Sequence, residues 1–248
     1  IASILVKPQA IMFTPIVMLV FAQDVLMSKN IKKKFFEFKA DRCIEHIKSI
    51  GITALAFLVV SMPFGLTKVM SQYVDTMGSY RYASVNAYNF WSMFGLNWKP
   101  QLGRVFGISY EQWGTIFIVL ICIFAFFMWL FKYKDDNRYV MIAIFISVAM
   151  FTMSVRMHER YIYPGVILLL LSFILTKHIQ ALLLYFGYTI AHFYNCAHVL
   201  FFYDSSNFDP RNGYIIIIST IHVILFGLFM IYIYIDDKIR YFTHQDGY

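Results

Sequence analysis

One short segment of this sequence gathers two guanidinium groups, an imidazole and a carboxylate, and it reads Arg156-Met157-His158-Glu159-Arg160-Tyr161. Arginine binds phosphate oxygens in pairs and keeps its charge near lipid. His158 could donate to a phosphate or a leaving group, and Glu159 could orient an arginine. If the segment is helical, Arg156 and Arg160 lie one turn apart and can clamp one anion. The alternative is an anchor in the lipid headgroups; because an anchor rarely needs a His–Glu pair, we favour an anion-binding site.

A second cluster, in residues 84–91, combines amides with aromatic rings and contains Asn86, Asn89 and Trp91. Amides bond sugar hydroxyls in pairs, and an aromatic face covers the apolar side of a pyranose. If this piece is helical, Asn86 and Asn89 share a face. The equal alternative is an interfacial aromatic belt in which asparagine serves as a cap or turn residue. The residues alone leave both interpretations open.

Two weaker candidates complete the set. His192 and His198 differ by roughly 120° in direction on a helix, with no carboxylate one turn away, so a metal site is disfavoured. His192 and Asn195 are better explained as hydrogen-bonding groups between helices. Lys7 either snorkels or faces a cavity and binds an anionic group. No phosphate-loop, zincin or serine-hydrolase motif is present, and we expect neither a metal nor another cofactor.

The elements that position these residues must be membrane helices. Of 248 residues, 60% are hydrophobic and only 14% are charged, against roughly 25% charged in soluble domains. Sustained apolar runs without alternation predict helices and exclude a barrel. The formal charge of +7 fits basic loops between spans and not a nucleic-acid partner. The three cysteines form no CxxC pair, so no disulfide framework is expected.

Windows of about 19 residues predict an all-α, polytopic transmembrane helical bundle with about seven spans. The chain begins inside an apolar stretch at Ile1, so we expect a single transmembrane domain over residues 1–248 that is the C-terminal part of a longer protein. The expected spans are 1–22, 50–64, 113–131, 139–155, 161–176, 179–198 and 214–235.

Charge asymmetry predicts the sides of the membrane. The loop 23–49 is rich in lysine and is therefore expected to be cytoplasmic. Alternation then places the loop 65–112 and all the polar clusters on the extracytoplasmic or lumenal face, in the cell membrane or, in a eukaryote, the endoplasmic reticulum. No charged residue lies near the centre of a clearly apolar predicted span, which argues against an ion channel or a proton pump.

Taken in order, these motifs resemble a known family. Lys7-Pro8-Gln9, Pro63-Phe64-Gly65, Asn86-Ala87-Tyr88-Asn89-Phe90-Trp91, Met157-His158-Glu159-Arg160-Tyr161 and His192-Phe193-Tyr194-Asn195 look like the C-terminal half of GT-C class membrane glycosyltransferases. The likeness is strongest to a bacterial mannosyltransferase-like group related to the enzyme that adds the second mannose of GPI anchors.

The resemblance implies transfer of a mannose-like hexose from a polyprenyl-phosphate donor to a glycan, lipid or protein acceptor at the outer face. In that class the catalytic acid usually lies in the first outer loop, which here would precede Ile1. No catalytic base is therefore assigned, and Glu159 and Asp75 are only outside candidates. The residues expected to bind the donor phosphate or line the sugar cavity are Arg156, His158, Glu159, Arg160, Tyr161, Asn86, Asn89, Trp91 and Lys7.

Two other functions use the same residues differently. A transporter or flippase for lipid-linked sugar would use the arginines as a headgroup dock and show translocation without turnover. A structural assembly subunit would use the outer clusters as protein contacts and would not bind polyprenyl phosphate.

Overall fold

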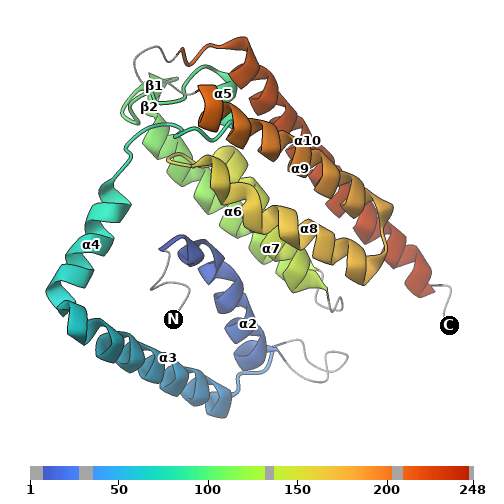
Figure 1. Ribbon diagram of the computed structural model, residues 1–248. Helices are drawn as coiled ribbons and strands as arrows, with labels where there is room; N and C mark the ends of the chain where they lie inside the picture. Colours follow the sequence, from blue (N-terminus) through green and yellow to red (C-terminus); the bar gives the residue numbers. More distant parts are fainter. Residues whose placement is uncertain (1–7, 28–35, 132–136, 203–208, 246–248) are drawn as a thin grey trace. The chain divides into compact units, whose positions relative to one another are not determined.

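The structure is a computed structural model that describes residues 8–27, 36–131, 137–202 and 209–245 (Figure 1). These residues are mostly helical, with one two-stranded hairpin, and the all-α prediction is confirmed. The chain forms two compact units, Ile1–Ser79 and Tyr80–Tyr248, which we call unit 1 and unit 2 and describe separately. That the units belong to a single transmembrane domain stays a prediction.

Unit 1 is a chain of helices: η1 (Pro8–Phe13), α2 (Thr14–Leu26), α3 (Ala40–Ser61), η2 (Met62–Phe64) and α4 (Leu66–Gly78). Asp24 joins α2 to the start of α3. Its carboxylate lies 3.0 Å from His46 Nε2, and its backbone carbonyl accepts a hydrogen bond of 3.1 Å from Lys39 Nζ. Phe21 stacks on the His46 ring with centroids 4.2 Å apart.

The basic loop is shorter than the predicted 23–49, because helices occupy both of its ends. Helix α3 begins at Ala40, where Asp41 in the first turn complements the helix dipole. Arg42 and Glu45 form an ion pair of 2.8 Å on the same helix. These local interactions extend the helix well before the apolar run starts at Ile50.

The predicted outer loop 65–112 also begins with a helix. Gly65 has a φ of +79°, a left-handed conformation that glycine adopts without steric cost and that lets the chain turn after η2. Helix α4 follows directly and ends at Gly78. The irregular part of the predicted loop is therefore confined to residues 79–109, most of which belong to unit 2.

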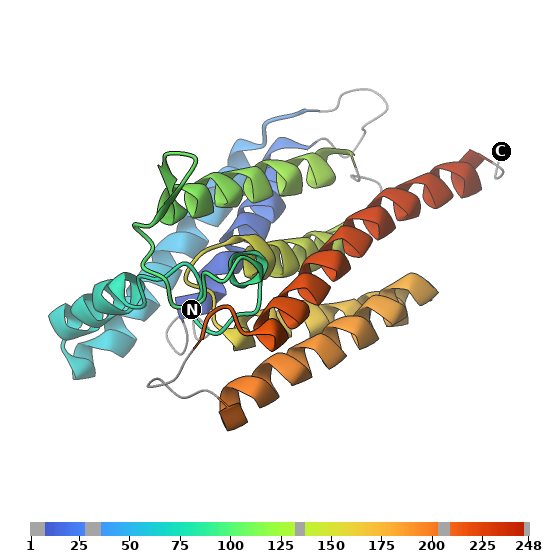
Figure 2. The same ribbon diagram turned by 90° about the horizontal axis from the view of Figure 1, so that it is seen from above.

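Unit 2 is a helical bundle capped at one end by irregular chain (Figures 1 and 2). Consecutive long helices pack on one another, and α10 also contacts α7 and the short helix α5. Only two residues separate α8 from α9, so these helices run antiparallel. The elements are α5 (Phe90–Met93), β1 (Arg104–Val105), β2 (Ile108–Ser109), α6 (Tyr110–Phe131), α7 (Arg138–Met153), η3 (Glu159–Ile162), α8 (Tyr163–Thr176), α9 (Ile179–Phe202) and α10 (Gly213–Gln245).

Helix α7 is the centre of the bundle, because its buried residues lie on all of its faces and it packs against α6, α8 and α10. Gly165 allows α8 to pack closely on it. A Cβ atom at this position would lie 3.0 Å from Val148 Cγ2 and 3.1 Å from Ser147 Cβ. A larger residue at position 165 would therefore require the Val148 and Ser147 side chains to shift.

Four helical stretches in the described residues are long and apolar enough to cross a membrane: Ala40–Phe64, Tyr110–Phe131, Glu159–Thr176 and Gly213–Ile235. The predicted count of seven spans is not supported. Ala10–Leu26 and Arg138–Met153 are apolar but shorter. Helix α9 is 24 residues long, but Gln180, His192 and Asn195 make it less apolar than the four spans.

The turn of the hairpin holds a phenylalanine in a conformation that suits asparagine or glycine. Phe106 has a φ of +52° and Gly107 of +78°, as a two-residue type I′ turn requires. The Phe106 side chain is 91% exposed, so it adds little packing to offset this strain.

We therefore expect Phe106→Asn to raise the free energy of unfolding by about 0.5–1 kcal/mol, measured by denaturant titration in micelles. Leu102→Asn removes a similarly exposed apolar side chain (72%) at a position without positive φ and should not stabilise. Lower stability of Phe106→Asn than of wild type would show that the phenyl ring makes a stabilising contact.

Candidate functional site

Two segments far apart in the sequence pair with each other at the capped end of unit 2. Val85 N donates to the Met157 carbonyl at 2.9 Å, and Arg156 N donates to the Tyr82 carbonyl at 3.2 Å. Isolated β-bridges join Val85 and Asn86 to His158. The two polar clusters predicted separately are thus brought together. We call Asn86, His158, Glu159, Arg160 and Tyr161 the His158 cluster.

Asn86 is held rigidly and presents one unused donor. Its φ of +61° places it in the left-handed region, so it is not helical and shares no helix face with Asn89. Asn97 Oδ1 accepts from Asn86 N at 2.8 Å, while Asn86 Oδ1 accepts from Trp98 Nε1 at 2.7 Å. Asn86 Nδ2 makes no hydrogen bond within the described residues and remains available to a ligand.

The His158 imidazole is packed between aromatic rings and is 8% exposed. Its centroid lies 4.8 Å from that of Tyr80 and 5.1 Å from that of Tyr161. Burial lowers the pKa of His158, and Arg160 lowers it further, while Glu159 opposes the shift. The ring is therefore neutral at pH 7 and offers one N–H donor and one acceptor nitrogen.

Glu159 orients Arg160, as the residue types suggested. Arg160 Nη1 lies 3.1 Å from Glu159 Oε1, and the side chains are 52% and 17% exposed, respectively. The guanidinium carbon also lies 5.8 Å from the Tyr161 ring centroid. One N–H of the guanidinium is thereby fixed on the carboxylate, and the exposed remainder can bind an anion.

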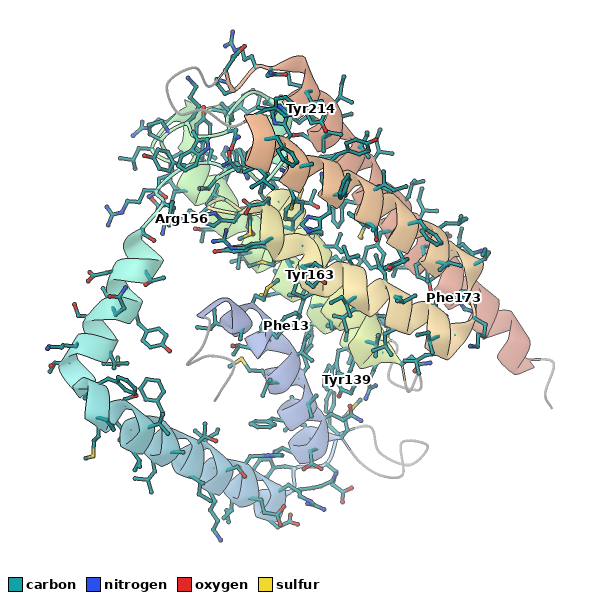
Figure 3. The ribbon with its side chains drawn as sticks, viewed as in Figure 1. Phe13, Tyr139, Arg156, Tyr163, Phe173 and Tyr214 are labelled. Carbon is teal, nitrogen blue, oxygen red and sulfur yellow. The ribbon has the colours of Figure 1, made fainter. Side chains whose placement is uncertain are left out.

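Arg156 does not form the expected i, i+4 clamp with Arg160. Its φ of +60° interrupts any helix across the segment, so no shared helix face exists. Arg156 Nε donates to Gln101 Oε1 at 2.6 Å, and Nη2 lies 2.9 Å from Glu111 Oε1. Arg156, labelled in Figure 3, instead ties the 156–158 segment to the start of α6.

The side chains of Asn89 and Trp91 form hydrogen bonds to the backbone at helix ends. Asn89 caps α5 by accepting from the backbone N–H groups of Trp91 and Ser92, and its Nδ2 donates to the Phe151 carbonyl at 3.0 Å. Trp91 Nε1 donates to the Met153 carbonyl at 2.9 Å. Both acceptors lie in the last turn of α7, where helix carbonyls lack intrahelical partners. Both side chains are also almost fully buried, so their expected role at the sugar has no free polar atom to use.

Sequence reasoning missed several residues that hold the cluster in place. Asn97 and Trp98 fix Asn86, and left-handed backbone at both Asn86 and Trp98 brings them into reach; their spacing carries no such signal. Asn195 on α9 was expected to bond another helix. It instead accepts from Tyr88 N at 3.1 Å and donates to the Asn86 carbonyl at 2.9 Å, which docks the loop onto the bundle.

The remaining candidates lie elsewhere. Lys7 falls outside the described residues. Asp75 belongs to α4 of unit 1, where it accepts from Ser71 Oγ at 3.3 Å. His192 lies 3.7 Å from Cys196 Sγ. Within the described part of the chain, no three His, Cys, Asp or Glu side chains gather where a metal ion could bind.

The lowered pKa of His158 predicts a pH-dependent stability. The unfolded chain binds a proton at His158 below about pH 6.5, the ordinary value, whereas the folded chain does so only at lower pH. As the pH is lowered from about 6.5 toward the pKa of His158 in the folded chain, the free energy of unfolding should therefore decrease by up to about 1.4 kcal/mol per pH unit. Denaturant titrations of wild type and His158→Gln at several pH values measure this difference, and parallel pH profiles would contradict it.

Comparison of the chain with protein-family models, curated proteins and solved structures finds no match.

Proposed function

We propose that this chain belongs to a membrane glycosyltransferase that moves a hexose from a polyprenyl-phosphate donor to an acceptor. The observation that carries the proposal is the meeting of Asn86, His158 and the Glu159–Arg160 pair at one polar end of an apolar bundle. A phosphate needs a cation, a sugar needs amide and imidazole hydrogen-bonding groups, and a polyprenyl chain needs lipid nearby. The His158 cluster provides the cation and the hydrogen-bonding groups, and it lies at the end of apolar helices that suit a lipid environment.

The chemistry assigned to these residues is binding and charge stabilisation. In the transfer, the bond between the anomeric carbon and a phosphate oxygen breaks, and the acceptor oxygen bonds to that carbon. Arg160, held by Glu159, would stabilise the negative charge that grows on the departing phosphate. Asn86 Nδ2 and neutral His158 would hydrogen-bond the sugar or the phosphate. The base that removes the proton of the acceptor hydroxyl is not assigned.

The direct test is a transfer assay with the full-length protein reconstituted in liposomes. A radiolabelled polyprenyl-phosphate hexose is supplied, and the label is followed from the lipid donor to an acceptor. Donor-dependent appearance of labelled acceptor supports the proposal. Binding of donor without turnover, with labelled lipid appearing in the opposite leaflet, would replace it by a transport function.

Transport of a lipid-linked sugar is the second candidate, because polar side chains lie inside the bundle. His222 is fully buried on α10, and neither ring nitrogen makes a hydrogen bond within the described residues, although the Tyr88 and Ile218 carbonyls lie beside the ring. The Tyr188 hydroxyl, on a ring whose centroid is 6.2 Å away, is likewise without a partner there. Polar groups inside membrane bundles commonly mark substrate or proton paths.

A further inference from the structure

Two hollows follow the seam between α9 and α10 and share two of their lining residues, Tyr194 and Tyr214. One is a pocket of about 660 Å³ at the end of α9 and the start of α10. The other is a groove of about 430 Å³ farther along the same two helices. Figure 2 shows α9 and α10 side by side, and Figure 3 labels Tyr214 at the capped end of the bundle. The two hollows therefore adjoin at these tyrosines, where the Tyr214 hydroxyl donates to the Tyr194 carbonyl at 3.2 Å.

Aromatic rings and two polar side chains line the pocket. His198 is sandwiched, with its centroid 4.4 Å from that of Tyr214 and 5.6 Å from that of Phe202. One Asp209 oxygen accepts from Arg211 N, and Asn212 Oδ1 accepts from Tyr214 N.

The second Asp209 oxygen and the Asn212 amide nitrogen make no further hydrogen bond within the described residues. The pocket thus presents an acceptor and a donor beside exposed aromatic rings. This combination suits sugar hydroxyls, while the Asp209 carboxylate repels a phosphate.

The groove has the opposite character, since aliphatic side chains line most of it. Leu225 packs directly on Gly187, where a Cβ atom would lie 2.7 Å from Leu225 Cδ2. The small Ala191 side chain on α9 leaves the groove open toward Ile218 and Ile221 on α10. The α9 wall from Gly187 to Tyr194 covers about 10 Å of helix. Such a channel on the face of a membrane helix pair fits a hydrocarbon chain.

We propose that the α9–α10 seam binds a glycolipid, with its uncharged, hydroxyl-rich headgroup in the pocket and an acyl or prenyl chain in the groove. Tyr88 connects this seam to the His158 cluster. Its hydroxyl lies 2.6 Å from His198 Nδ1, and its backbone N–H bonds Asn195, which also holds Asn86. The seam is thereby placed to present an acceptor glycolipid to the His158 cluster. This acceptor role rests on the proposed function, whereas glycolipid binding to the seam does not.

The test is photo-cross-linking of the full chain in phosphatidylcholine nanodiscs, with a monoglucosyl diacylglycerol that carries a photoactivatable acyl chain. Cross-links should map to residues 187–194 and 218–225. Unlabelled monoglucosyl diacylglycerol should compete, and phosphatidylglycerol should not. Ile221→Trp fills the groove and should reduce cross-linking about tenfold, as should Ile190→Trp on the opposite wall. Leu228→Trp is the control, on an exposed α10 residue outside the groove.

The headgroup is tested separately with Asp209→Asn, which keeps the bond to Arg211 N and removes the charge. This variant should bind monoglucosyl diacylglycerol about fivefold more weakly and allow phosphatidylglycerol to compete. Equal competition by phosphatidylglycerol in the wild type, or unchanged cross-linking in both groove variants, would overturn the proposal. Because no sugar donor is present, Arg160→Ala should cross-link normally. If Arg160→Ala loses sugar transfer but still cross-links the glycolipid, the defect lies in the His158 cluster and the seam proposal stands.

Discussion

Arg160→Ala is expected to lower kcat/KM for sugar transfer by about 10²- to 10³-fold, the effect of removing about 3–4 kcal/mol of transition-state stabilisation. The leaving phosphate gains negative charge as the glycosidic bond breaks. Arg160 is 52% exposed and already oriented by Glu159 at 3.1 Å, so its remaining N–H groups can meet that charge without reorganisation. The measurement is the initial rate of transfer in liposomes at several donor concentrations.

Three variants make this result specific. Arg104→Ala removes an exposed arginine of the hairpin and should leave the rate unchanged. Arg160→Lys keeps the charge but loses the paired geometry, so its rate should fall between those of wild type and Arg160→Ala. Glu159→Gln removes the carboxylate that orients the Arg160 guanidinium, so it should lower the transfer rate less than Arg160→Ala does. Wild-type kinetics in Arg160→Ala would show that Arg160 is a headgroup anchor and not part of the site.

Asn89→Ala is expected to lower the free energy of unfolding by about 3–5 kcal/mol, the largest stability effect of a single side chain that we predict. The amide joins two helix ends: it caps α5 through Trp91 N and Ser92 N and satisfies carbonyls at the end of α7, including Phe151. Since the residue is fully buried, water cannot replace these bonds. SDS titration of the protein in mixed micelles measures the change.

The matched variant is Asn89→Asp, which keeps the capping oxygen but turns a donor into a second acceptor facing the Phe151 and Ser154 carbonyls. It should be at least as destabilising as alanine. Asn212→Ala removes an exposed cap and should cost only about 1 kcal/mol. A loss below about 1 kcal/mol in Asn89→Ala would mean that the loop repacks around the missing amide.

The helices were largely predictable from the sequence, because apolar runs in lipid have no other way to satisfy their backbone. The number of spans was not predictable, because the polar residues at the start of α3 and inside α9 obscure where each membrane segment begins and ends. Pro15 lies in the first turn of α2, and the extended backbone of Ser154 ends α7; hydropathy registers neither feature.

The site was predictable in its residue types and not in its geometry. His158, Glu159 and Arg160 stand out by chemistry, and Glu159 does orient an arginine. The left-handed backbone at Asn86 and Arg156 is invisible in a propensity pattern, yet it decides that the two segments pair and that the arginines do not clamp together. For Asn89, the two interpretations left open were a sugar ligand and a cap, and its bonds are those of a cap.

The docking of residues 86–88 by Asn195 bears on how this protein is made. Helices insert into a membrane one by one and associate afterwards, and α9 and α10 follow every residue of the His158 cluster in the sequence. Until they arrive, the backbone of Asn86 and Tyr88 has no Asn195 to bond, and α5 has no α10 to rest on. The polar end therefore takes its shape only after α9 and α10 have been made. A nascent chain stalled before α9 would carry every residue of the His158 cluster and still lack Asn195, which docks the backbone of Asn86 and Tyr88 onto the bundle.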